Sequence, residues 1–168
     1  FETQNIWGFI KGKKHPDSII IISAHYDHLG MMGKAIYPGA NDNASGTSIV
    51  LELANYFSKN QPDISLAFVL FSGEEAGLKG STYMSNHLPF PKEKVDLVLN
   101  LDMVASGSEG ITMVNGKQFP EVFNAFTAIN KQNNYLKKVN IRGESCNSDH
   151  CPFYKIGIPS VFIYTNGP

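Results

Sequence analysis

Acidic side chains and imidazoles stand at the ends of several apolar segments of this sequence. They are His25 and Asp27 after residues 18–24, Glu74 and Glu75 after residues 64–71, Asp102 after residues 95–101, Asp42 in the loop 38–46, and His150 ahead of residues 160–164. Two imidazoles and several carboxylates form a donor set that suits zinc or a similar divalent cation. Without a cation, so many acidic groups in one cleft would repel one another and lose hydration. The residue types therefore predict a divalent-metal site.

The apolar segments that precede these residues have the length and composition of strands. Residues 18–24, 64–71, 95–101 and 160–164 are rich in Val, Ile, Leu or Phe without clean alternation, which is typical of strands buried on both faces of a parallel sheet. Residues 6–11 alternate better and predict a strand of an edge hairpin that turns at residues 12–14. Residues 111–114 predict a further short strand.

Amphipathic patterns between these segments predict helices. Residues 44–59 and 119–132 carry apolar side chains at a spacing of three to four, and residues 80–87 predict a shorter helix. The alternation of strand and helix indicates an α/β fold with a largely parallel sheet. Ligands of such sheets bind at the carboxyl ends of the strands, so we expect the polar residues named above to converge in one crevice.

Composition narrows the possible partners. The 168 residues suffice for one domain with a hydrophobic core, and no repeat or linker divides them. Fourteen basic and fifteen acidic residues give a net charge of −1, and no Lys/Arg run is longer than a pair. Nucleic acid and anionic membrane surfaces are therefore not expected as partners. No apolar run approaches the roughly 20 residues that a transmembrane helix needs.

Each of these features has a simpler explanation when taken alone. A His after a strand is usually a surface or hydrogen-bonded residue, adjacent glutamates are usually solvated, and Asp at a helix start is usually a cap. The loop from Asn41 also resembles a calcium loop, but no helix precedes it and its first ligand would be Asn. No G-x-S-x-G follows a strand, and no Walker-type or dinucleotide glycine pattern occurs. The metal hypothesis thus depends on the whole set.

Five strings, taken in order, resemble metallopeptidase family twenty-eight. They are HYDHLG at residues 25–30, GANDNASG at 39–46, FSGEEAGLKGS at 71–81, NLDM at 100–103 and SDH at 148–150. This family holds secreted bacterial leucyl aminopeptidases, aminopeptidase Y, glutamate carboxypeptidase and the related glutaminyl cyclases. The resemblance spans about residues 3 to 168. It implies an α/β three-layer sandwich with a central, mostly parallel mixed sheet, here a single peptidase catalytic domain over residues 1–168.

The resemblance also implies a role for each residue of the set. Asp42 would bridge two zinc ions, or two other divalent metals, and in this family the peptide bond that follows it is often cis. Glu75 and His150 would complete the ligands of one metal. His25 and Asp102 would complete those of the other. Asp27 would accept a hydrogen bond from His25. Glu74 would be the general base that activates a metal-bridging hydroxide. The implied activity is a secreted zinc aminopeptidase acting on peptide or protein N-termini, in an extracellular or periplasmic location.

Some features leave alternatives open. Relatives usually continue with a His-containing stretch and a final helix beyond the point where residues 165–168 end, and usually begin with a further helix and strand, so the sequence is expected to hold the core of the domain. Cys146 and Cys151 flank His150 and would either pair or stay reduced. A glutaminyl cyclase with one zinc and a non-catalytic peptidase-like domain are the alternative functions. The side-chain preference and the oligomeric state are not predicted.

Overall fold

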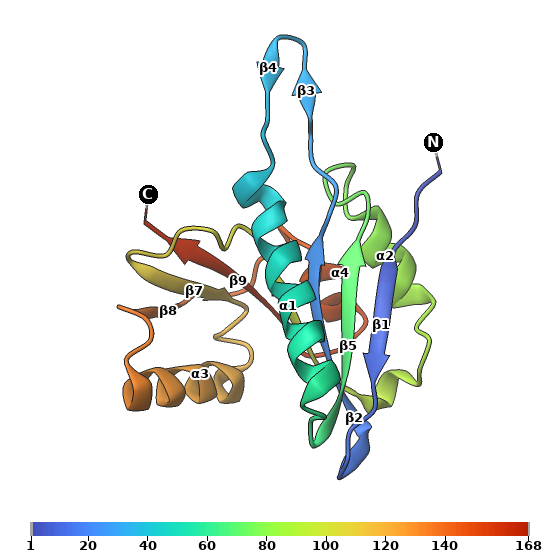
Figure 1. Ribbon diagram of the computed structural model, residues 1–168, viewed down its shortest axis with the longest axis vertical. Coiled ribbons are helices and arrows are strands. Elements are labelled where there is room, and N and C mark those ends of the chain that lie inside the picture. Colours follow the sequence, from blue (N-terminus) through green and yellow to red (C-terminus); the bar gives the residue numbers. More distant parts are fainter. Residues whose placement is uncertain (1, 168) are drawn as a thin grey trace.

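A mixed seven-stranded sheet forms the centre of the protein, as a computed structural model that describes residues 2–167 shows (Figure 1). Its strands are β1 (Ile6–Ile10), β2 (His15–His25), β5 (Ile64–Phe71), β6 (Val95–Leu101), β7 (Gly110–Val114), β8 (Val139–Ile141) and β9 (Ser160–Asn166). The helices are α1 (Gly46–Lys59), α2 (Lys79–Asn86), α3 (Pro120–Asn133) and α4 (His150–Lys155). A separate two-stranded hairpin consists of β3 (Met31–Met32) and β4 (Ala35–Ile36).

The order of the strands explains why residues far apart in the sequence meet. The sheet runs β1-β5-β2-β6-β9-β7-β8. Its central strands β5, β2, β6 and β9 are parallel, whereas β1 pairs antiparallel with β5 and β7 pairs antiparallel with β9. The carboxyl ends of β2, β5 and β6 consequently lie at one edge of the sheet, and the segments that follow these three strands start there.

Helices cover both faces of the sheet, which gives the three layers that the resemblance implies. On one face, apolar side chains of α1 and α3 pack on a buried cluster that includes Ile22, Leu66 and Phe68. On the other face, Met84 of α2 and Phe153 of α4 belong to a second buried cluster. Strands β2, β5 and β6 are buried on both faces because each contributes side chains to both clusters.

The main elements confirm the expectations from the sequence, but one pairing was wrong. Segment 6–10 is an edge strand, yet it pairs with β5 and forms no hairpin with β2. The period-2 pattern specifies a strand but not its partner, and the backbone of Lys13 and Lys14 bonds to Pro62 and Asp63 at the start of β5. The hairpin β3–β4, the strand β8 and the helix α4 were not predicted, because each has too few residues to show a period.

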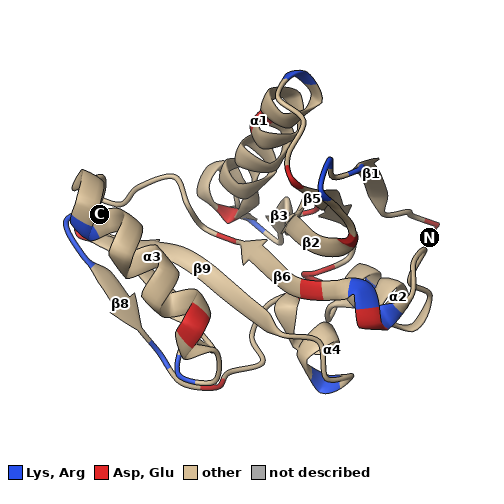
Figure 2. Ribbon diagram, turned by 90° about the horizontal axis from the view of Figure 1, so that it is seen from below, with Lys and Arg blue, Asp and Glu red and all other residues tan. Residues whose placement is uncertain are grey.

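Charged side chains are distributed over separate parts of the surface. Lys and Arg residues occupy several places far from one another and alternate with acidic residues (Figure 2). This distribution agrees with the near-neutral net charge. Among residues 2–167, no helix combines the length and the hydropathy needed to cross a bilayer.

Candidate metal centre

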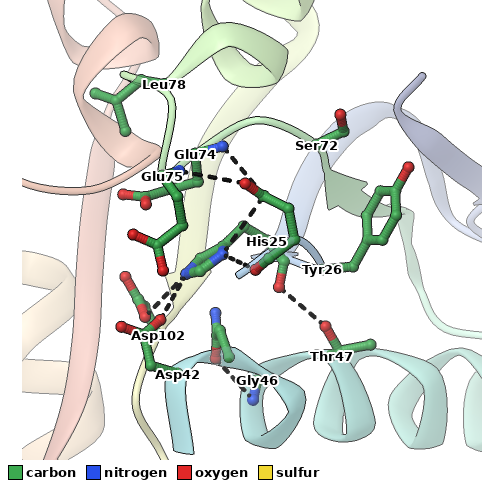
Figure 3. Close-up of polar contacts among 12 residues, drawn as sticks. His25, Tyr26, Asp42, Gly46, Thr47, Ser72, Glu74, Glu75, Leu78 and Asp102 are labelled. Carbon is green, nitrogen blue, oxygen red and sulfur yellow. Dashed lines mark hydrogen bonds and ion pairs between the residues drawn. The ribbon is translucent and has the colours of Figure 1, made fainter. Parts of the chain in front are cut away.

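His25 occupies the centre of the candidate site, at the last position of β2. Its side chain is only 1% exposed, and its Nε2 lies 3.1 Å from Oδ1 of Asp42 and 3.3 Å from Oδ1 of Asp102 (Figure 3). Ligand atoms of these three residues all lie within 4.8 Å of one another. The sequence placed them 17 and 77 residues from His25, and the shared edge of the parallel sheet brings them together as expected.

The loop that presents Asp42 is fixed to the end of β6. The peptide bond between Asp42 and Asn43 is cis, as the resemblance implied. The side chain of Asn43 donates a hydrogen bond to the carbonyl of Leu101 at 3.0 Å and accepts one from the backbone N–H of Gly46, also at 3.0 Å. A Cβ at position 46 would lie 2.5 Å from the carbonyl oxygen of Leu101, so only glycine allows the start of α1 to approach β6 this closely.

Glu74 and Glu75 lie in a turn directly after β5, and Asp27 holds this turn against β2. The carboxylate of Asp27 accepts hydrogen bonds from the backbone N–H groups of Glu74 at 3.1 Å and Glu75 at 3.3 Å (Figure 3). The sequence led us to expect a hydrogen bond from His25 to the Asp27 carboxylate, but the structure has a different contact between these two residues. His25 Nδ1 donates instead to the main-chain carbonyl of Asp27 at 3.0 Å, while the nearer carboxylate oxygen is 3.6 Å away because that group binds the turn.

Asp102 is positioned by a buried row of hydrogen bonds that sequence reasoning missed. Ser23 donates to Asn100 at 2.9 Å, Asn100 donates to the Ser148 hydroxyl at 2.8 Å, and Ser148 donates to Oδ2 of Asp102 at 2.7 Å. Ser148 therefore connects the C-terminal SDH string to the carboxylate at the end of β6. The signal in the sequence was Ser148 itself, next to Asp149 and His150.

His150 and Glu75 lie outside the close group of three. His150 is fully buried, its Nε2 lies 2.8 Å from the carbonyl oxygen of Ser145, and its ring packs on Phe162 at 5.6 Å between centroids. Glu75 extends from its turn toward Asp42 and His25 (Figure 3). The Nδ1 of His150 is buried without a hydrogen-bond partner among the described residues, whereas Nε2 contacts the carbonyl of Ser145. Ligation by His150 stays a prediction.

A disulfide joins Cys146 to Cys151 and encloses the segment that carries Ser148 and His150. The two Cα atoms are 4.8 Å apart, and Cys151 is buried while Cys146 is exposed. Of the two states that the sequence left open for these cysteines, the structure has the paired one.

Residues 5–168 of the sequence match the family described as "Peptidase family M28". The chain belongs to this family. Aminopeptidase YwaD of Bacillus subtilis is 34% identical over 96% of the chain and 36% of its own length. A probable zinc metalloprotease of Pyricularia oryzae is 39% identical over 63% of the chain and 22% of its own length. The M28 chain thus spans about a third or less of these curated relatives.

Solved structures agree with the M28 assignment. The zinc aminopeptidase BSAP from Bacillus subtilis superposes with a TM-score of 0.80 at 28% identity, over 98% of this chain and 40% of that one. An aminopeptidase from Aneurinibacillus sp. strain AM-1 gives a TM-score of 0.77 at 32% identity, over 96% of this chain and 39% of that one. A glutaminyl cyclase from an Acidobacteriales bacterium gives a TM-score of 0.83 at 24% identity, over 98% of this chain and 59% of that one. At this identity the similarity shows a shared fold and nothing about function.

The imidazole and carboxylate groups of the M28 site are suitable ligands for a divalent cation. Burial alone would lower the pKa of His25, but the hydrogen bond and charge of Asp102 overcome this effect and raise the pKa to about 10. A proton on Nε2 thus supplies the positive charge that the carboxylates of Asp42 and Asp102 require. One imidazole nitrogen and two carboxylate oxygens within 4.8 Å form the kind of donor set that binds zinc, so the residues fit this cation.

The acidic groups around these three residues hold their protons unusually tightly. Burial raises the pKa of Glu74 to about 8 and that of Asp149 to about 7. Burial also raises the pKa values of Asp42 and Glu75. The carboxylate oxygens of Asp149 are buried without a hydrogen-bond partner among the described residues. The metal-free M28 site therefore disfavours its own negative charges, which a bound cation would stabilise.

We expect the metal-free protein to lose stability as the pH rises from about 6.5 to about 9. The pKa values of Glu74 and His25 rise on folding, from 4.5 to about 8 and from 6.5 to about 10, so the native state binds more protons than the unfolded chain over this interval. The lowered pKa of His150 has the opposite effect only below about 6.5. Urea unfolding in the presence of a chelator at several pH values measures the trend, and a midpoint that rises toward pH 9 would contradict it.

Ser148→Ala tests the row of hydrogen bonds behind Asp102. Loss of the Ser148 hydroxyl frees the Asp102 carboxylate and leaves the amide of Asn100 without its acceptor. Zinc affinity is expected to fall about 10–100-fold, the usual effect of removing a group that orients a ligand. Competition with a chromophoric chelator measures it. Ser160→Ala is the matched control, because Ser160 is equally buried but bonds to Ile158 at the far end of β9; an equal loss there would indicate a general effect on folding.

Proposed function

We propose that this chain is the catalytic core of a zinc aminopeptidase that hydrolyses the N-terminal peptide bond of peptides. The observation that carries the proposal is the buried nitrogen of His25, which faces carboxylate oxygens of both Asp42 and Asp102. The names of the relatives support it, since matches over nearly the whole chain include proteins called aminopeptidase and zinc aminopeptidase. Because the chain spans about a third of such relatives, the activity of the complete protein is part of the proposal.

The proposed zinc ligands are His25 and Asp102 for one ion and Glu75 for a second, with Asp42 shared between them. The support for two ions is the excess of carboxylates, because Glu75 lies beside the group of three and feels the charge of Asp42. His150 remains the predicted further ligand of the second ion. Zinc in this site would polarise the scissile carbonyl and lower the pKa of water toward neutrality.

Glu74 is proposed as the general base. Its carboxylate is partly buried beside His25 and Asp102, and burial raises its pKa to about 8. A carboxylate with a pKa near the working pH can take a proton from the attacking water and then deliver it to the departing amine. Asp27 holds the Glu74–Glu75 turn through two backbone N–H groups, so it fixes where the base stands relative to His25.

We also propose that the protein works in an oxidising compartment. The support is the disulfide between Cys146 and Cys151, because such bonds persist mainly in secreted or periplasmic proteins. Growth of the native host followed by fractionation and immunoblotting would locate the protein. Recovery in the cytoplasm with both thiols free would contradict the proposal.

The function is tested by metal analysis and hydrolysis of a panel of aminoacyl-anilides with the full-length gene product. About two zinc ions per chain and release of the free amine support a two-zinc aminopeptidase. One zinc per chain together with cyclisation of an N-terminal Gln would instead indicate a glutaminyl cyclase. Failure to bind zinc at neutral pH would indicate a peptidase-like domain without catalysis.

A further inference from the structure

The hairpin β3–β4 projects from the body of the protein beyond the carboxyl ends of the central strands (Figure 1). Its side chains are mostly apolar and exposed to solvent: Leu29, Met31, Met32, Ile36 and Tyr37. Met31 is 68% exposed and Ile36 is 74% exposed, which is unusual for neighbouring large apolar residues on a soluble surface. Such a patch beside a candidate active site indicates contact with a ligand.

A pocket of about 290 Å³ lies where this hairpin joins the body. Its lining includes Leu29 and Tyr37, which flank the two strands of the hairpin, and Asp42 and Glu75 from the candidate metal centre. The pocket and the centre are therefore continuous. The volume is just below the range typical of sites for drug-sized molecules, about 300–1,000 Å³, so it suits one side chain of a larger ligand.

Contacts at the base of the hairpin hold the walls of this pocket. The backbone N–H of Tyr37 donates to the carbonyl of Gly30 at 2.8 Å and closes the two arms on each other. The ring of His28 packs so closely on Gly39 that a Cβ there would lie 2.7 Å from it. Gly39 also has a φ of 73°, which favours glycine. The pocket is thus formed by the fold, while the tip of the hairpin extends beyond it.

The position of Glu74 indicates which side of the substrate reaches the pocket. In the proposed mechanism Glu74 returns a proton to the departing amine, so the leaving group must lie on the side of the Glu74–Glu75 turn. The pocket is lined by Glu75 of that same turn. We therefore expect the residue that follows the scissile bond to project toward Leu29 and Tyr37.

We propose that this pocket binds the side chain of the second residue of the substrate and favours an apolar one. The inference rests on the proposed aminopeptidase function and adds a substrate class to it: peptides with a large apolar residue in second position. Hydrocarbon walls from Leu29 and Tyr37 gain from removing such a side chain from water, whereas a charged side chain would lose hydration there.

Binding to the full-length Glu74→Gln protein tests the inference without turnover. Calorimetry with Leu-Phe-amide and Leu-Gly-amide is expected to show at least about 10-fold tighter binding of the first peptide, the range that apolar pockets provide. Tyr37→Ala and Leu29→Ala in the same background are expected to remove most of that difference and to leave Leu-Gly-amide nearly unaffected. Met32→Ala is the matched control, because Met32 is exposed on the hairpin but does not line the pocket.

The outcomes separate the two proposals. Equal affinity for the two peptides, or a preference that survives both pocket substitutions, overturns the assignment of the pocket. Hydrolysis of leucine anilide by the protein with Glu74 intact then still supports the aminopeptidase. If that protein hydrolyses neither anilide nor peptide, the proposed function is wrong, while the calorimetric difference continues to decide whether the pocket selects apolar side chains.

Discussion

Glu74→Gln is expected to lower kcat by about 10²–10⁴-fold while the protein keeps its zinc, because a positioned general base contributes a factor of that size. The amide has nearly the shape of the carboxylate but cannot accept the proton of the attacking water. Glu74 donates its backbone N–H to Asp27, and the substitution leaves this contact in place. Steady-state hydrolysis of leucine anilide and metal analysis of the same preparation measure the two parts of the prediction.

Two further variants make this result specific. Glu75→Gln, in the same turn, is expected to lose zinc as well as activity, because Glu75 is a proposed ligand. Glu52→Gln changes an exposed carboxylate on α1 and is expected to alter neither. If Glu74→Gln kept activity near that of the unaltered protein, Glu74 would not be the base. If the Glu74→Gln variant lost its zinc, Glu74 would be a metal ligand instead of the base.

The parts of the site that the sequence predicted are those fixed by the parallel sheet. His25 and Asp102 are the residues at or directly after the carboxyl ends of neighbouring strands β2 and β6, so pairing of these strands brings the two side chains to the same edge. Asp42 joins them because the loop before α1 crosses that edge. Apolar strand runs and the alternation of strand and helix were therefore enough to expect this group.

The parts that the sequence did not predict depend on contacts between distant loops. Ser148 reaches Asp102 only because the segment before α4 follows β8, whose path is set by pairing with β7 and by the bond from Ser145 N–H to Asn115. The contact of His25 with the carbonyl of Asp27 likewise depends on how the Glu74–Glu75 turn folds. No period in the sequence reports such contacts, since they involve single polar residues in irregular backbone.

The second large effect is expected for Asp42→Asn, which should nearly abolish stabilisation by zinc. Asp42 is the proposed shared ligand, and its Oδ1 lies 3.1 Å from the ring nitrogen of His25. Zinc at 100 times its dissociation constant stabilises a protein by about 2.7 kcal/mol, and a 100-fold loss of affinity reduces that figure to about 0.4 kcal/mol. Thermal or urea unfolding with and without zinc measures the difference. Asp63→Asn, at a surface pair with Lys14, is the control and should retain full stabilisation.

The same variant separates a metal-binding role of Asp42 from a structural one. Burial and the charge of Asp102 raise the pKa of Asp42, so its negative charge opposes folding of the metal-free protein at neutral pH. The asparagine side chain carries no charge, and the metal-free Asp42→Asn protein is therefore expected to be at least as stable as the unaltered protein above pH 7. A variant that loses its response to zinc but keeps its stability shows that Asp42 serves the cation. A large loss of metal-free stability would assign it to the fold instead.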